Sequence, residues 1–356
     1  MSGSETVSTT ESEPQPTITA RASRYIVSPA FDLSFFVLAP VLALIVGGVL
    51  PHTFLNNESE YFGETWISLF LAVFVMSHLI ITAFRSHGNP RIFHSFPIRF
   101  TIIPVVLFLA MGFSLWAIVI VSVLATFWDV YHSSMQTFGI GRIYDMKAGN
   151  EPLAGRRLDI TLNILLYAGP IAAGATLMDH INDFSEFERV GSLFFTEIPA
   201  YVEFNSGILR VLVLGAGVPF LCYYVYAYWN LSRQGYNVSY QKVALLTFTG
   251  ICSLFAWGFN PFGMAFFIMN FMHAWQYFAI VWWSDRASIE RVFRLQGKPR
   301  AGPIAFVLLI TVGLVYGLIA GLYDSDSDWV FSAFLVVSVM HFWYDGFIWS
   351  VKRKQF

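Results

Sequence analysis

The sequence predicts an all-α fold, a polytopic bundle of about ten transmembrane helices, and three observations support this prediction. Of the 356 residues, 56% are hydrophobic and only 12% are charged, which is about half of the roughly 25% charge that soluble domains carry. The mean hydropathy is +0.59. Apolar runs recur along the chain, and several reach the length of about 20 residues that a helix needs to cross a bilayer.

The predicted spans follow the apolar runs in order. They cover residues 31–50, 66–84, 98–111, 115–136, 160–178, 208–229, 243–257, 262–283, 304–323 and 329–349. The third and fourth runs are divided at the sequence GFS, because one uninterrupted helix across both would be too long for a single span. Residues 1–24 are rich in Ser, Thr, Glu and Pro, which predicts a disordered cytoplasmic tail. Residues 25–356 are predicted to form one transmembrane helical domain.

The distribution of charge predicts the orientation of the bundle. Lys and Arg concentrate in cytoplasmic loops, and a cytoplasmic N-terminus places 19 of the 21 basic residues on the inner side. The opposite loops are acidic, as in NNESEYFGE and DSDSD. Ten spans with both termini in the cytoplasm explain this alternation. The predicted location is the cell membrane, or the membrane of the endoplasmic reticulum in a eukaryote.

Composition also restricts the possible functions. The formal charge of -2 argues against nucleic acid as a partner, because no basic face stands out. The two cysteines, Cys222 and Cys252, lie in apolar runs and are too few for a disulfide framework. Aromatic residues make up 18% of the chain, more than interfacial belts require, which suggests that some of them line an apolar cavity.

Six of the eight histidines share the inner half of the predicted bundle. They are His78, His87, His94, His132, His273 and His341, of which His87 and His94 fall in the inner loop RSHGNPRIFHSFPIR. Only His52 and His180 fall on the outer side. Ionisable groups at membrane depth are costly and usually mark a site, so six histidines at one depth indicate convergence on a functional centre.

The histidines within the spans have polar neighbours three or four residues away, which lie on the same helix face. Asp129 and Gln136 flank His132, Asn270 and Gln276 flank His273, and Asp345 follows His341. A fourth acid, Asp32, opens the first span at the same level and is either part of the centre or an N-cap. Imidazole and carboxylate together are ligands for iron, zinc and manganese, and a carboxylate or amide often orients the ligating ring.

The pattern therefore predicts a metal centre with one or two ions, most readily iron, with zinc or manganese as alternatives. All six inner histidines are candidate ligands. Asp129, Gln136, Gln276 and Asp345 are candidate catalytic residues that orient ligands or position a bound water. For any single histidine with an acid one turn away, a helix hydrogen bond is the simpler interpretation. His87 and His94 are equally compatible with ordinary loop residues.

This layout resembles the His-rich polytopic membrane oxygenases. Integral diiron desaturases and hydroxylases hold two irons with histidines on the cytosolic side, and bacterial carotene dioxygenases hold iron with histidines inside a helix bundle. Their HxxxH and HxxHH boxes are absent, because no two histidines here lie within four residues of each other. The resemblance implies that His78, His132, His273 and His341 are ligands, and that Asp129 and Asp345 bind or orient.

The predicted function is that of a membrane-embedded, metal-dependent oxygenase that uses non-haem iron and dioxygen on a lipid-like substrate. Its predicted partners are the lipid bilayer, an apolar small molecule and an electron-donor protein. One alternative is a proton-coupled transporter or channel that uses the same His and Asp groups. Another is a haem-binding electron carrier. A site for a phosphate headgroup near RSHGNPR, with Arg142, Arg156 and Arg157, is a further possibility.

Overall fold

The computed structural model describes residues 24–49, 66–174, 206–260, 262–322 and 327–349. Within these ranges the regular secondary structure is entirely helical, without strands, so the all-α prediction is confirmed. His52, His180, residues 1–23 and most of the acidic segments that are predicted to lie on the outer side fall outside the described residues.

The chain begins with a broken helix made of α1 (Pro29–Asp32), η1 (Leu33–Val37), α2 (Ala39–Leu44) and η2 (Ile45–Val49). The helices that follow are α4 (Trp66–Ser86), α5 (Pro90–Ser95), α6 (Pro97–Phe113), α7 (Leu115–Lys147), α8 (Arg156–Gly174), α12 (Ser206–Arg233), α13 (Tyr240–Phe259), α14 (Phe262–Val292), α15 (Ala301–Leu322) and α16 (Asp328–Ile348). Each predicted run overlaps one of these helices, or the broken helix in the case of the first. The division at GFS also holds, since Ser114 is the N-cap of α7 and its side chain accepts from the backbone N–H of Ala117.

Six of the described helices are long and apolar enough to cross a membrane, namely α7, α12, α13, α14, α15 and α16. The broken first helix bends by 49° at Leu38 and makes a seventh if it is one span. Shorter apolar helices occur at Val73–Ser86 and Pro97–Phe113. These helices support a membrane-embedded protein, while the count of ten spans and the orientation of the termini stay predictions.

Asp32 has neither of its two predicted roles. The N-cap of α1 is Ser28, whose hydroxyl accepts from the N–H of Phe31. The buried carboxylate of Asp32 instead accepts from the backbone of the preceding turn, with Ile26 N–H at 2.6 Å, and from the Tyr144 hydroxyl at 3.0 Å. Asp32 therefore ties the start of the described chain to the C-terminal end of α7.

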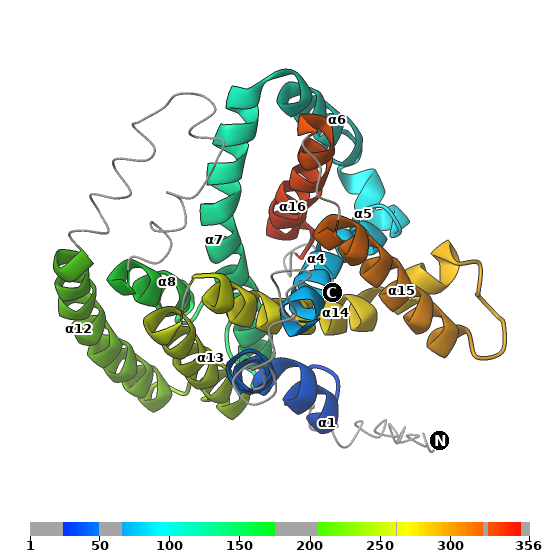
Figure 1. Ribbon diagram of the computed structural model, residues 1–356. Coiled ribbons are helices and arrows are strands. Elements are labelled where there is room, and N and C mark those ends of the chain that lie inside the picture. The colour runs from blue at the N-terminus through cyan, green and yellow to red at the C-terminus, as the bar shows by residue number, and fades with distance from the viewer. Residues whose placement is uncertain (1–23, 50–65, 175–205, 261, 323–326, 350–356) are drawn as a thin grey trace, which may run out of the picture.

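The helices that carry the candidate site lie in the middle of the bundle, with α12 at one edge and α15 at the opposite side (Figure 1). Helix α4 packs against α14, α15 and α16, and α7 packs against α8, α13 and α16. The close contact between α4 and α15 depends on small residues, because a Cβ atom at Gly317 would collide with the carbonyl of Val73, and Gly313 faces Ser77. This contact fixes the helix that carries His78.

Candidate metal centre

Four of the six candidate histidines meet in the interior of the bundle. They form the His cluster, with one residue from each of four helices: His78 from α4, His132 from α7, His273 from α14 and His341 from α16. All four side chains are buried. Neighbouring ring centroids are 4.7 to 5.0 Å apart, and those of His273 and His341 are 5.9 Å apart. Contacts between the four rings thus join segments that are far apart in the sequence.

The spacing of the ring nitrogens suits metal ligation. Ligand atoms of His78, His273 and His341 lie within 4.8 Å of one another, and so do those of His132, His341 and Asp345. The Nε2 atoms of His132 and His273 are 3.1 Å apart. Two nitrogens bound at about 2.1 Å to one ion lie roughly 3.0 to 3.4 Å apart, for bond angles between a right angle and the tetrahedral angle.

Hydrogen bonds fix the tautomers of two cluster histidines. The Nδ1 of His78 contacts the carbonyl oxygen of Val75, which only accepts, so this nitrogen carries the proton. Tyr277 donates to Asp345 at 2.9 Å, and its oxygen is 2.6 Å from the hydroxyl of Thr82. The Tyr277 oxygen therefore accepts from Thr82.

The same reasoning continues to His341. Because the Thr82 proton points to Tyr277, the Thr82 oxygen accepts from Nδ1 of His341. His78 and His341 thus both hold their proton on Nδ1 and keep a lone pair on Nε2. Metal-binding histidines characteristically donate their other ring N–H to such a partner, which sets the tautomer and orientation of the ring.

Three nitrogens of the cluster have no hydrogen-bond partner among the described residues: Nε2 of His78, Nε2 of His341 and Nδ1 of His273. An unsatisfied buried polar group costs about 1–3 kcal/mol. A metal ion would accept the lone pairs of His78 and His341, so the free nitrogens indicate a site built for a ligand.

The predicted acids of α7 and α16 are both held by hydrogen bonds. Asp345 lies beside the His cluster, with Oδ2 at 3.8 Å from Nε2 of His132, and also accepts from the indole N–H of Trp349. Asp129 accepts from Asn270 at 3.1 Å, which links α7 to α14. Among the described residues, Asp345 is thus the acid that lies within ligand distance of the cluster.

The two predicted glutamines connect helices. Gln136 donates to the backbone carbonyl of His273 and to Oε1 of Gln276, both at 3.1 Å. Gln276 in turn donates to the carbonyl of Phe36 at 3.0 Å, in the π-helical turn of the first helix. These contacts hold the backbone of His273 in place, so the geometry assigns the glutamines a positioning role.

His87 and His94 lie outside the cluster. Both are exposed. The ring nitrogens of His87 are 2.8 Å from the Ser86 hydroxyl and 3.1 Å from the carbonyl oxygen of Phe100, and Nδ1 of His94 donates to Pro90 at 2.6 Å. In the described part of the chain neither belongs to a group of His and acid side chains close enough to share an ion. The candidate ligand set is therefore the His cluster with Asp345.

A buried ion pair that the sequence did not indicate lies between α4 and α14. Arg85 of α4 lies 2.5 Å from Asp285 of α14 and donates to the carbonyl of Ile348 at 2.9 Å. The side chain of Asn89 donates to the same aspartate. The sequence signal is an acid, Asp285, on the side that is predicted to be cytoplasmic, where basic residues prevail. This contact joins α4, α14 and α16 near the cluster.

A second buried polar group, the charge network, consists of Arg142, Asp145, Asp159 and Lys242 and was also missed. Both cations contact both carboxylates, at 2.6 to 2.8 Å. The guanidinium of Arg142 is therefore already paired, which argues against its predicted contact with a phosphate headgroup. Tyr236, in the loop before α13, donates to Asp145, and burial together with this hydrogen bond raises the pKa of Tyr236 above its ordinary value.

Comparison of the chain with known protein families, with curated proteins and with solved structures finds no match. The resemblance to His-rich membrane oxygenases stays a prediction, and the candidate site rests on its own geometry.

Proposed function

We propose that this protein is a membrane-embedded, metal-dependent oxidoreductase that holds non-haem iron in the His cluster and acts on a lipid-like apolar substrate. The observation that supports this most strongly is the fixed tautomers of His78 and His341, whose Nε2 lone pairs face a buried centre without hydrogen-bond partners among the described residues. Four buried imidazoles and one carboxylate at this spacing have a simple explanation in a shared ion.

The ligand types favour iron. His132, His341 and Asp345 form a group of two histidines and one carboxylate, which is the ligand combination of many non-haem iron oxygenases. His78 and His273, which form a second group with His341, would add further nitrogen ligands. When bound, iron supplies the binding and activation of dioxygen. The protein residues hold the ion and keep the site in a buried, apolar environment that limits competing water.

The surroundings favour an apolar substrate. The ring of Phe342 lies 5.1 Å from that of His132. Phe74 of α4 packs against Phe271 of α14, and these two helices carry His78 and His273. A substrate that dissolves in the bilayer reaches such a centre without crossing water. The electron donor is proposed to be a separate protein at the cytoplasmic face.

Metal analysis tests this proposal. Protein purified from iron-supplemented cells should contain near-stoichiometric iron, and the double variant His132→Ala/His341→Ala should lose it. His94→Ala is the matched control, because His94 is exposed and outside the cluster, and it should keep the metal of the unmodified protein. Equal metal contents in the double variant and the unmodified protein would refute the assignment of the cluster. A different stoichiometric metal would refute iron alone.

The two alternatives remain distinguishable by experiment. The 3.1 Å separation of Nε2 in His132 and His273 leaves no room for a haem plane between them, so this pair does not favour the electron carrier. An intense Soret absorption band would reverse that judgement. A proton-coupled transporter would show flux in proteoliposomes that disappears in Asp129→Asn.

We also propose that the protein crosses the cell membrane ten times, with both termini on the cytoplasmic side. The helices overlap all ten apolar runs, and ten spans would place the basic loops on one side. In a cysteine-free background, a membrane-impermeant maleimide added to intact cells should label Asn57→Cys and spare Gln234→Cys. The opposite labelling would show that the orientation is inverted.

A further inference from the structure

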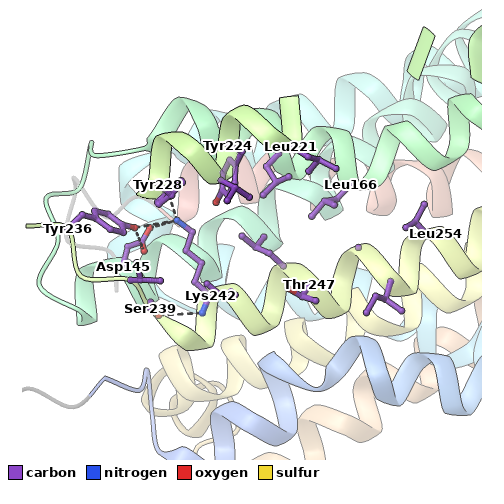
Figure 2. Close-up of a pocket in the computed structure, with 17 residues that line it drawn as sticks. Asp145, Leu166, Leu221, Tyr224, Tyr228, Tyr236, Ser239, Lys242, Thr247 and Leu254 are labelled. Atoms are coloured by element: carbon purple, nitrogen blue, oxygen red, sulfur yellow. Dashed lines mark hydrogen bonds and ion pairs between the residues drawn. The ribbon is translucent and has the colours of Figure 1, made fainter. Parts of the chain in front are cut away.

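A cavity of about 460 Å³ lies between α8, α12 and α13, apart from the His cluster. Its walls are mainly aliphatic, with Leu166 of α8, Leu221 of α12 and Leu254 of α13 among them, and Figure 2 shows these side chains along its length. The volume is in the range of small-molecule sites, about 300–1,000 Å³. We call this space the tail cavity.

The tail cavity is elongated and has one polar end. From Lys242 to Leu254 its lining follows α13 for three turns, about 18 Å at 1.5 Å per residue. Figure 2 shows Asp145, Tyr228, Tyr236 and Lys242 gathered at the end near the loop before α13. An elongated apolar cavity with polar groups at one end fits a lipid tail better than a compact solute.

The polar end offers little to a charged group. The ammonium of Lys242 donates to Asp145 at 2.8 Å, to Asp159 at 2.7 Å and to the hydroxyl of Tyr228 at 2.8 Å. These bonds use all three of its protons. Arg142 balances the second carboxylate, so the charge network is neutral as a whole. The headgroup of a ligand must therefore lie beyond this point.

A second cavity, of about 420 Å³, is lined by the same loop, and we call it the head cavity. It shares Tyr236, Val238 and Ser239 with the tail cavity. Its remaining lining is largely polar and includes Asn237, Gln241 and Arg24. Among its described lining residues, Arg24 is the one that carries a charge. Its guanidinium suits a carboxylate or phosphate, to which it can donate two parallel hydrogen bonds.

From these two cavities we infer a binding site for a single-chain lipid with an anionic headgroup, with the tail between α8, α12 and α13 and the headgroup beside Arg24. The headgroup lies toward the loop side of the bundle, where basic residues collect, and the tail follows α13 toward the bilayer centre. The inference does not depend on a metal in the His cluster, because none of the cluster residues lines either cavity.

Direct binding to the purified full-length protein tests the site. The probes are palmitic acid, 1-palmitoyl lysophosphatidic acid and hexadecanol, which share one tail and differ in the headgroup, each titrated in detergent and measured by native mass spectrometry. Both acids should bind saturably and more tightly than hexadecanol. Palmitic acid and lysophosphatidic acid then distinguish a carboxylate from a phosphate as the preferred anion.

Variants separate the tail from the headgroup. Leu254→Trp and, from the opposite wall, Leu221→Trp should each weaken binding of all three probes about tenfold or more, the equivalent of about 1.4 kcal/mol. Both residues are exposed to the surroundings, at 58% and 40%, so the substitutions are compatible with folding. Arg24→Gln should weaken the two acids and leave hexadecanol unchanged. Leu212→Trp, on a part of α12 that does not line the cavity, is the matched control and should change nothing.

Three results would overturn the inference. Equal weakening by Leu212→Trp and Leu254→Trp would indicate annular lipid only. Non-saturable binding of every probe would mean that there is no site, and equal affinities for hexadecanol and the acids would exclude the anionic headgroup. The His132→Ala/His341→Ala protein should bind the acids as the unmodified protein does, so failure of the metal proposal and failure of this one are separate outcomes.

Discussion

Replacement of Lys242 by Met should strongly destabilise the protein, because it leaves two buried carboxylates with a single cation. In the folded state the Lys242 ammonium lies 2.7 Å from Asp159 and 2.8 Å from Asp145. Asp145 and Asp159 are 1% exposed and Lys242 is 4% exposed, so water cannot replace the lost ammonium. Methionine has a similar length, so it keeps the packing of the side chain while it removes the charge.

Removal of one partner from a buried ion pair costs about 3–5 kcal/mol, because the remaining charge stays buried without compensation. Arg142 still contacts both carboxylates, which places the expected loss near the lower end, about 3 kcal/mol. The double variant Asp145→Asn/Lys242→Met restores the charge balance. It should be more stable than Lys242→Met alone.

The assay is the free energy of unfolding in mixed micelles, from titration with a denaturing detergent. Arg286→Met is the matched control, because it breaks the pair with Glu290 in which the arginine side chain is 57% exposed. An exposed pair contributes about 0–1 kcal/mol. If Lys242→Met costs no more than Arg286→Met, or if Asp145→Asn adds its full penalty on top, the reasoning about the charge network is wrong.

The other predictions concern the metal centre and the packing around it. Thr82→Val removes the acceptor for Nδ1 of His341 and should lower metal affinity about 10- to 100-fold, measured by competition with a chromogenic chelator. Thr101→Val removes an exposed helix hydroxyl and should leave the metal affinity unchanged. Gly317→Ala should destabilise the folded protein by about 1–3 kcal/mol, because the added Cβ meets the carbonyl of Val73. Gly258→Ala, with open space around it, should not destabilise the protein. Equal effects of the two substitutions would contradict close packing of α4 and α15. Removal of the metal by a chelator should lower the midpoint of thermal unfolding, by an amount that grows with the metal concentration before removal. A ligand at about 100 times its Kd adds roughly 2.7 kcal/mol to the free energy of unfolding. A midpoint unaffected by metal would argue against binding to the folded state.

The sequence by itself determined the helical, membrane-embedded class and the position of each apolar helix. These properties depend on local composition, because a run of apolar residues must satisfy its backbone hydrogen bonds within the helix wherever it lies in the bilayer. The boundary at Ser114 was also local, because its hydroxyl caps α7. The membrane depth of the histidines stays a prediction, because it depends on the predicted limits of each span.

Only the tertiary structure decided which of the candidate histidines meet. His78, His132, His273 and His341 converge while His87 and His94 do not, because convergence depends on how each helix is rotated and how the helices cross. Hydrophobic spacing alone does not settle the rotation of a helix that is apolar on all sides.

The residues that orient the centre were hidden for the same physical reason. Thr82 meets Tyr277 across 195 residues of sequence and His341 across 259, and a threonine in an apolar helix carries no local sign of such a partner. The charge network likewise joins α7, α8 and α13. The sequence determined which groups are expensive to bury, and the packing of the helices decided which partners make that burial possible.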